Sequence, residues 1–387
     1  MLELPPLSLY VHLPWCVRKC PYCDFNSHER QSPIPEAAYL GALKEDLHQE
    51  LAALDNSLSR RPLASVFFGG GTPSLLGAAF YADFLHDLDQ AGLVSQNTEI
   101  TLEANPGTAE ASRFRDFREA GINRLSLGIQ SFDDAYLKKL GRIHDSAGAR
   151  NAIEIARGAG YDNLNLDLMF GLPGQSTKQA IEDLEIALGF DTPHLSWYQL
   201  TIEPNTVFYN EPPRLPAENV LIDTHQSGIA LLQNAGLARY EVSAFARQGL
   251  HCRHNQNYWE FGDYIGIGAG AHGKYTLPEQ QAIIRTRKSR QPESYMYNSL
   301  GRSAGRDDVP LADRPLEFLM NGLRLVDGFR VESFEKRTGV PFSAIRKQVE
   351  SLVQRGLIEL NESSMRATEE GYWYLDSILQ EFLPSGQ

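Results

Sequence analysis

Three cysteines stand close together near the start of the chain, at Cys16, Cys20 and Cys23. Their spacing, C-x3-C-x2-C, lets one short loop supply thiolates to three irons of a [4Fe–4S] cluster, and the fourth iron stays open to a small molecule. Two alternatives remain at this point: a zinc site completed by a histidine such as His12 or His28, and a chance spacing. We predict the [4Fe–4S] cluster.

The remaining cysteine, Cys252, stands alone. A group of three cysteines is not a disulfide framework, and in a reducing compartment it indicates a metal site. The first residues carry no basic region followed by a long apolar run, which argues against a signal peptide. No stretch approaches the roughly 18 apolar residues that a membrane-spanning helix needs. We therefore expect a cytoplasmic protein without a transmembrane segment.

Composition and charge narrow the class of protein further. Of 387 residues, 42% are hydrophobic and 22% are charged, which is typical of a globular protein with a large core. The 36 Lys and Arg residues against 49 Asp and Glu residues give a formal net charge of −13. A strongly acidic chain lacks the positive field that attracts nucleic acid, so we expect no nucleic-acid partner.

The first half of the chain alternates between short apolar runs and helical patterns. One helical face is marked by leucines at steps of three and four, from Leu40 to Leu54. Regular alternation predicts a parallel sheet with helices outside it, and six units indicate a partial (β/α)6 barrel, an α/β fold. The six apolar runs are 7–13, 65–68, 99–103, 124–129, 163–170 and 194–200.

Notable residues lie late in, at the end of, or just after each of the six predicted strands. In a parallel barrel the carboxyl ends of the strands meet at one rim, where active sites form. Each residue alone could be an ordinary loop group, but six together predict one site. In strand order they are Cys16, then Gly69 to Thr72, Glu103, Gln130, Asp167, and Tyr198 with Gln199.

The rest of the chain has a different pattern. A helix over 218–235 and a strand over 238–245 precede the segment HNQNYW at 254–259, a glycine-rich turn at 266–273 and a polar stretch at 286–313 that looks like a linker. From about residue 316 the order helix, helix, helix, short hairpin, helix resembles a winged helix. Its eight Lys and Arg against eleven Asp and Glu favour a lid or protein-contact role over DNA binding. We predict domains at 1–235, 236–313 and 314–387.

Several segments together resemble the oxygen-independent coproporphyrinogen dehydrogenase family of radical S-adenosylmethionine (SAM) proteins, and within it most closely the haem-chaperone branch. The resemblance covers nearly the whole chain and implies a [4Fe–4S] cluster that cleaves SAM to a 5′-deoxyadenosyl radical. The segments are Y-x-H-x-P-W-C-x3-C-x-Y-C-D-F-N from Tyr10, GGGTPS (69–74), LEANP (102–106), LGIQSF (127–132), GRIHD (141–145), LDLMFGLPGQ (166–175) and HNQNYW.

The resemblance also implies which residues contact SAM. Glycines suit the cradle for the methionine end, because only a bare backbone approaches a ligand so closely. For Arg142 a helix-surface charge and for Asp167 a helix-capping group are the structural alternatives. The residues that match SAM-contacting positions are Tyr10, Tyr22, Gly70, Gly71, Thr72, Glu103, Gln130, Arg142 and Asp167.

Two departures separate this chain from the dehydrogenases of the family. Those enzymes resemble it but carry a fourth cysteine where Phe25 stands here, and a longer segment before the motif. The resemblance therefore implies a chaperone that binds haem and passes it to an acceptor protein, with coproporphyrinogen III decarboxylation as the alternative. His254 offers a neutral imidazole as a haem ligand; its alternative is a buried histidine bonded to a backbone carbonyl. The basic run from Arg285 to Arg290 either meets haem propionates or is a solvated linker.

Overall fold

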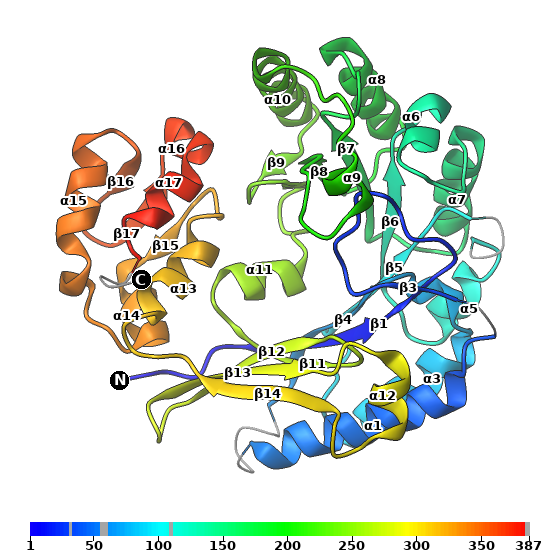
Figure 1. The fold of residues 1–387 in the computed structure, drawn as a ribbon, viewed down its shortest axis with the longest axis horizontal. Helices are drawn as coiled ribbons and strands as arrows, with labels where there is room; N and C mark the ends of the chain where they lie inside the picture. Colours follow the sequence, from blue (N-terminus) through cyan, green and yellow to red (C-terminus); the bar gives the residue numbers. More distant parts are fainter. Residues whose placement is uncertain (31–32, 55–60, 108–110, 384–387) are drawn as a thin grey trace.

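The computed structural model describes residues 1–30, 33–54, 61–107 and 111–383. Its main feature is a twelve-stranded sheet in the order β14-β13-β12-β11-β1-β4-β5-β6-β7-β8-β10-β9. The six neighbouring strands from β1 to β8 run parallel and curve into an open barrel, which confirms the predicted partial (β/α)6 fold (Figure 1). They are β1 (Leu7–Leu13), β4 (Leu63–Gly70), β5 (Glu99–Ala104), β6 (Arg124–Gln130), β7 (Leu164–Phe170) and β8 (His194–Gln199).

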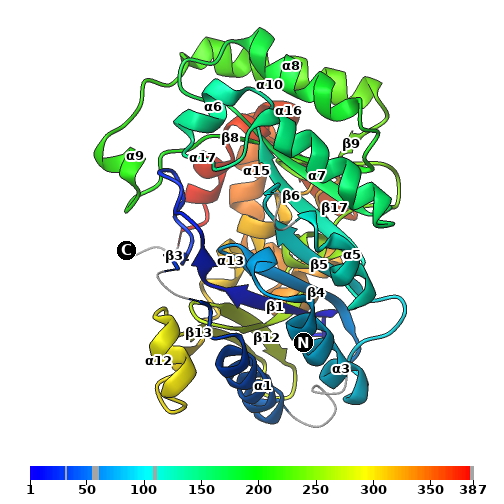
Figure 2. The same cartoon turned by 90° about the vertical axis from the view of Figure 1, so that its right-hand side faces the viewer.

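Helices cover the outer face of this curved sheet, as Figures 1 and 2 show. Apolar side chains of the strands point outward and pack against the helices in the largest core of the molecule. The polar side chains therefore point into the barrel, because successive residues of a strand face opposite sides. The helices are α1 (Glu36–Ala53), α3 (Ala78–Gln90), α5 (Phe114–Glu119), α6 (Asp134–Lys139), α7 (Ser146–Gly158), α8 (Thr177–Leu188) and α10 (Glu218–Asn234).

Local sequence signals fix where several of these helices begin. The side chain of Asp133 accepts hydrogen bonds from the first turn of α6, and Asp145 does the same for α7. Ser176 and Gln179 form a reciprocal capping box at the start of α8. Such caps satisfy backbone N–H groups that have no partner within the helix. The loops after β6 and β7 therefore end at defined positions, which holds the site residues they carry.

The stretch predicted as a linker at 286–313 is folded, so that prediction was wrong. β11 (Asp263–Ile267) pairs parallel with β1, and the antiparallel strands β12 (His272–Leu277), β13 (Ala282–Lys288) and β14 (Ser303–Asp308) continue the sheet, with α12 (Pro292–Tyr297) between the last two. The polar residues of this stretch suggested a solvated linker, but Lys288 is buried and pairs at 2.5 Å with both Asp46 and Glu50 of α1. A paired charge can lie inside a fold where an unpaired one cannot.

The opposite edge of the sheet also differs from expectation. The single strand predicted over 238–245 is two short strands, β9 (Ala238–Arg239) and β10 (Ala244–Ala246), which pair antiparallel with each other. A turn separates the two strands, and within it the buried Glu241 carboxylate accepts hydrogen bonds from the backbone N–H and the hydroxyl of Ser243. The shorter elements of the barrel are β2 (Trp15–Cys16), β3 (His28–Glu29), η1 (Pro73–Leu75), α9 (Val207–Asn210) and α11 (Arg253–Trp259).

The C-terminal part builds a three-stranded sheet with helices around it, as the winged-helix pattern predicted. Its own apolar core meets the barrel where Phe261 packs edge-on against Phe318, beside α11 (Figure 1). The division at 235 and 313 stays a prediction, and residues 384–387 lie outside the described part. The elements are α13 (Arg314–Gly322), β15 (Phe329–Arg330), α14 (Val331–Thr338), η2 (Phe342–Ala344), α15 (Arg346–Gln354), β16 (Ile358–Leu360), β17 (Ser364–Ala367), α16 (Glu369–Trp373) and α17 (Leu375–Gln380).

None of the helices within the described ranges is both long and apolar enough to cross a membrane. The longest of them, α1, carries several charged residues along its length.

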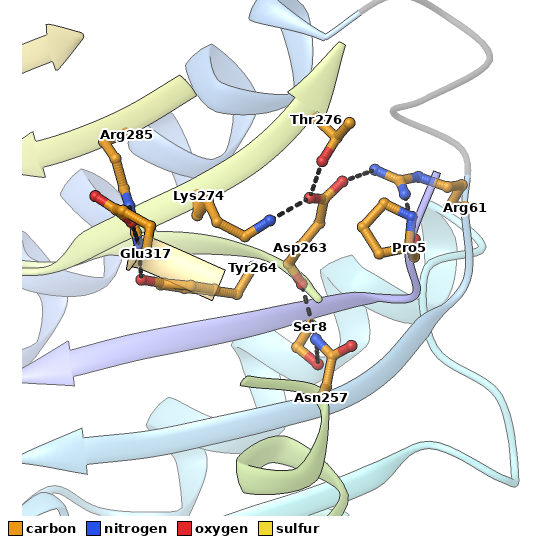
Figure 3. A network of polar contacts seen from close by, with 10 residues as sticks. All are labelled: Pro5, Ser8, Arg61, Asn257, Asp263, Tyr264, Lys274, Thr276, Arg285 and Glu317. Carbon is orange, nitrogen blue, oxygen red and sulfur yellow. Dashed lines mark hydrogen bonds and ion pairs between the residues drawn. The ribbon is translucent and has the colours of Figure 1, made fainter. Parts of the chain in front are cut away.

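A buried carboxylate holds the junction of β11 with its neighbours. Asp263 is fully buried and accepts hydrogen bonds from Lys274 at 3.2 Å, Arg61 at 3.1 Å and Thr276 at 2.9 Å (Figure 3). Burial lowers the pKa of Lys274 to about 8, although the Asp263 charge opposes that shift. The two charges therefore depend on each other, because neither has access to water.

Removing this carboxylate is expected to destabilise the fold strongly. We predict that Asp263→Asn lowers the free energy of unfolding by about 3–5 kcal/mol, because it leaves the Lys274 ammonium buried without its counter-charge. The matched control is Asp307→Asn, which breaks an exposed ion pair with Arg287 and is expected to cost less than about 1 kcal/mol. Urea unfolding followed by circular dichroism measures both. Equal losses in the two variants would contradict the prediction.

Candidate functional site

The three clustered cysteines lie on and after β2, at the carboxyl end of β1. Cys16 is buried, whereas Cys20 and Cys23 are partly exposed. The loop is tight, because the backbone N–H of Cys23 donates to the carbonyl of Cys20 at 3.1 Å. Burial raises the pKa of the Cys16 and Cys23 thiols. Bound iron would favour the thiolates, because a coordinating thiol loses its proton.

The glycine-rich loop after β4 lies directly against the cysteine loop. The backbone N–H of Gly71 donates to the carbonyl of Leu13 at 2.7 Å, and that of Thr72 to the carbonyl of Trp15 at 2.7 Å. A Cβ atom at Gly71 would lie 2.5 Å from the Trp15 carbonyl oxygen. Gly70 has φ +114°, a conformation that residues with side chains rarely adopt. Glycine is therefore required here for close contact between two loops.

Hydrogen bonds join four loops into a closed arrangement, which we call the polar ring. Thr72 Oγ1 donates to Cys16 Sγ at 3.6 Å and accepts from Asn105 Nδ2 at 2.9 Å. Arg142 donates to Asn105 Oδ1 and, at 3.7 Å, to Cys20 Sγ. The polar ring thus consists of Cys16, Thr72, Asn105, Arg142 and Cys20. Arg142 is therefore no surface charge, and its guanidinium holds the cysteine loop against the barrel rim.

A cavity of about 280 Å³, the cluster cavity, opens at this rim. Eleven of the thirteen predicted site residues line it, whereas Tyr10 and His254 do not. Phe25, at the position of the absent fourth cysteine, also lines it and is 61% exposed. The predicted residues around the cluster cavity are Cys16, Cys20, Tyr22, Cys23, Gly70, Gly71, Thr72, Glu103, Gln130, Arg142 and Asp167.

Two carboxyl groups form the floor of the cluster cavity. Glu103 accepts a hydrogen bond from the backbone N–H of Gly70 at 3.2 Å. Burial, and next the nearby charge of Asp167, raises the pKa of Glu103 to about 8. Asp167 accepts hydrogen bonds from Ser126 and Asn165, each at 2.8 Å, and burial raises its pKa as well. Asp167 is therefore no helix cap, and the cavity floor favours a cationic ligand.

A second cavity, the barrel cavity, lies on the other side of these carboxyl groups. It measures about 270 Å³ and shares Glu103, Ser126 and Asp167 with the cluster cavity. Tyr10 and His254 line it. Tyr10 lies in the middle of β1, one layer below the rim, and its hydroxyl bonds to His12. The predicted SAM contact of Tyr10 stays a prediction, and this position does not support it.

His254 enters the barrel from α11. It is 8% exposed, and its ring stacks on Phe67 with centroids 4.8 Å apart. Its Nδ1 lies 3.2 Å from Ser65 Oγ, which itself donates to Ser8. Nδ1 therefore carries the proton and donates, which leaves the lone pair of Nε2 facing the barrel cavity. Burial lowers the pKa of His254 to about 3, so the imidazole is neutral.

The remaining residues of the HNQNYW segment fix the position of α11. Asn257 Nδ2 donates to Ser8 Oγ at 3.1 Å and to the Asp263 carbonyl at 2.9 Å (Figure 3). Tyr258 packs against Tyr264, and the guanidinium of Arg324 lies 4.3 Å from the Trp259 ring. Tyr258 and Trp259 also line the barrel cavity, so these rings combine packing contacts with a place on its wall.

The zinc alternative gains no support from the two candidate histidines. Both ring nitrogens of His12 are bonded, Nδ1 to Tyr10 at 3.0 Å and Nε2 to the Asn26 carbonyl at 2.9 Å. His28 bonds to the Arg290 carbonyl at 3.2 Å. Cys252 is fully buried beside Glu99, away from the other cysteines. Within the described ranges, no three His, Cys, Asp or Glu side chains are gathered closely enough to hold a single metal ion.

Sequence reasoning missed residues that the site depends on. Asn105 closes the polar ring, and its place in the LEANP segment was the available signal. Ser126 bonds to Asp167, and only its inward place on β6 indicates a role. Tyr198 was noted as a strand-end residue, and its hydroxyl donates to Gln130 at 2.7 Å. Gln130 itself has φ +69°, a strained value for a residue with a side chain.

The donor set of the cluster cavity fits the implied cofactors. Three cysteines line it, which is the number of thiolate ligands that a cluster with one open iron takes. Gly70 and Gly71 line the cavity, and a Cβ atom at either position would collide with the His12 ring or with the Trp15 carbonyl. The Nε atom of Arg142 is buried without a hydrogen-bond partner, so a polar ligand atom could satisfy it.

Comparison with known protein families agrees with this chemistry. Residues 10–187 match the radical SAM superfamily, and residues 309–374 match the HemN C-terminal domain. The first match spans the strands and loops that carry the cysteines, the glycine-rich loop and the acids.

Full-length relatives are also similar. The chain is 47% identical to the heme chaperone HemW of Haemophilus influenzae over 99% of each chain, and 46% identical to that of Escherichia coli over 99% of this chain and all of the other. It is 37% identical to a mitochondrial radical S-adenosyl methionine domain-containing protein 1 of Bos taurus, over 97% of this chain and 87% of the other. The solved structure of coproporphyrinogen III oxidase (HemN) from Escherichia coli has the same fold, with TM-score 0.80, 21% identity, and coverage of 99% and 91%.

Iron content is expected to distinguish variants of the three clustered cysteines from a variant of Cys252. We predict that Cys16→Ser, Cys20→Ser and Cys23→Ser each lose most of their iron and of the absorbance near 400 nm after anaerobic reconstitution, because the cluster needs all three thiolates. Cys252→Ser is the control and is expected to keep both, since Cys252 is buried elsewhere. Loss of the cluster in Cys252→Ser alone would contradict this assignment.

The raised pKa of Glu103 predicts a pH dependence of SAM affinity. Below pH 8 the carboxyl is protonated, and a cationic sulfonium favours the carboxylate, so binding must release a proton. Affinity is therefore expected to rise by up to about tenfold per pH unit below pH 8 and to level off above it. Equilibrium dialysis with cluster-loaded protein measures this slope. Glu103→Gln should remove the slope, whereas Glu279→Gln, an exposed carboxyl between β12 and β13, should keep it.

Proposed function

Because the chain belongs to the HemW family of radical SAM proteins, we propose that it is a haem chaperone, which binds haem and transfers it to an acceptor protein. The observation that carries the proposal is the likeness to heme chaperones at 46–47% identity over the full length of both chains. Phe25, where a dehydrogenase of the wider family has its fourth cysteine, supports the same conclusion. We further propose a cytoplasmic location.

The cluster cavity supports a resident [4Fe–4S] cluster with SAM on its open iron. When bound, the cluster supplies an electron for cleavage of SAM. Arg142 and Thr72 orient the cysteine loop through the polar ring, and Gly70, Gly71 and Thr72 of the loop after β4 line the cavity wall. Glu103, once it has released its proton, supplies negative charge on the floor beside Asp167, which favours a cationic ligand.

Haem ligation by His254 stays a prediction. What supports it is the Nε2 lone pair that faces the barrel cavity. A haem at that atom would need more room than about 270 Å³ offers, since ligand sites commonly measure about 300–1,000 Å³. The proposed function does not depend on this residue, because a chaperone needs a haem site but not a particular axial ligand.

A second function, decarboxylation of coproporphyrinogen III, is favoured by one observation. The residues around the cluster cavity include all those expected for SAM binding except Tyr10, with Glu103 and Asp167 in place. A chain that retains these residues has the parts for radical chemistry.

Haem titration tests the proposed function. We predict a saturable Soret band at a fixed ratio of haem to protein, in cluster-loaded and cluster-free protein, because a chaperone must hold its cargo stoichiometrically. Transfer is then followed as a shift of that band to the Soret position of the acceptor when a haem protein without its haem is added.

The outcome that contradicts the proposal is equally direct. Absence of saturable haem binding, together with formation of protoporphyrinogen from coproporphyrinogen III in an anaerobic assay with SAM and reductant, would establish the enzyme instead. Haem binding without that product supports the chaperone.

A further inference from the structure

A groove larger than the cluster cavity lies beside it at the cluster end of the barrel. It measures about 750 Å³ and runs between the cysteine loop and the loops after β5 and β6. Arg18 and Arg142 line both spaces, and Arg142 lies 3.7 Å from Cys20 Sγ. We call this space the rim groove. A ligand in the rim groove would therefore lie next to the cluster and SAM.

Three cations in the rim groove have no partner. Arg18, Arg30 and Lys138 are exposed, and within the described ranges their side chains make no ion pair or hydrogen bond. The two acids of the groove are engaged in capping, since Asp134 accepts from the backbone of Ser146 and Asp145 caps α7. Free positive charge at one place in a chain of net charge −13 favours an anionic ligand.

The basic run on β13, by contrast, is already neutralised. Arg285 pairs with Glu317, Arg287 with Asp307, and Lys288 with two acids of α1. These three side chains are therefore not free to meet haem propionates, which was one of the two alternatives for this run.

Apolar side chains lie beside the free cations. Ile143 is 54% exposed and Val17 is 38% exposed, and Leu75 lines the same groove. Exposed apolar groups next to unpaired positive charge suit a ligand that is flat and apolar in its body and anionic at its edge. The volume lies within the range of about 300–1,000 Å³ that is usual for small-molecule and cofactor sites.

We propose that the rim groove binds the tetrapyrrole, with its two propionates at Arg18, Arg30 and Lys138 and its ring against Val17 and Ile143. This inference rests on the proposed function and gives it a location. It places haem beside the cluster cavity, at the carboxyl ends of the strands, rather than at His254 inside the barrel. The site needs no movement of α11.

Charge reversal in the groove tests this location on the full chain. The double variant Arg30→Glu/Lys138→Glu is expected to weaken haem binding by about tenfold or more in a Soret titration, because it removes two attractions and adds two repulsions. Lys347→Glu, at an exposed position on α15 without an ion pair, is the matched control and should bind as the wild type does. Ile143→Ala should weaken binding, whereas Leu300→Ala, 97% exposed elsewhere, should not.

Esterified haem separates charge recognition from apolar contact. Haem dimethyl ester should bind the wild type more weakly than haem, and should bind the double variant and the wild type equally. His254→Ala should keep its haem affinity. Circular dichroism of each variant shows that it is folded.

Each remaining result overturns the site. Haem affinity that is unchanged in the double variant and lost in His254→Ala would place haem in the barrel cavity. Unchanged haem affinity with slower reduction of the cluster by an acidic electron-transfer protein would make the groove a protein-docking site. Absence of haem binding by the wild type would contradict the proposed function itself, and the groove with it.

Discussion

The contact between the loop after β1 and the loop after β4 is the constraint on which the site depends. Two backbone hydrogen bonds of 2.7 Å join these loops, and Gly71 permits them because no Cβ atom could fit against the Trp15 carbonyl. That contact brings Thr72 within reach of Cys16, and the polar ring then extends through Asn105 and Arg142 to Cys20. Residues from four separate loops are thereby held at one rim, before any cofactor contributes.

The two cavities on either side of Glu103 and Asp167 present different groups and therefore favour different ligands. The cluster cavity has thiols above and carboxyl groups below, so it favours a ligand that is positive and binds iron. The barrel cavity has a neutral imidazole opposite the same acids, and α11 closes it. Burial, and next the nearby charge of Asp167, keep the pKa of Glu103 high, which couples cation binding at the rim to proton release.

The elements after residue 235 extend and close the barrel rather than stand apart from it. β11 joins β1 directly, and the buried Asp263 holds that junction through Lys274 and Arg61 (Figure 3). The backbone of the same residue accepts from Asn257, which fixes α11 and so places His254. The cations along β12 and β13 are paired with acids in this packing. The unpaired cations Arg18, Arg30 and Lys138 lie instead beside the cysteines.

The sequence by itself determined the cysteine loop, the six parallel strands and the gathering of Glu103, Gln130 and Asp167 at one rim. These features are local or follow from strand alternation, so patterns along the chain are sufficient to predict them. Only the tertiary structure decided that Tyr10 and His254 line a separate cavity, and that the polar stretch at 286–313 is sheet. The contact of Ser65 with His254 spans 189 residues, and the burial of Lys288 depends on acids 238 and 242 residues away. Such pairings leave no periodic signal, because each partner alone looks like an ordinary polar residue.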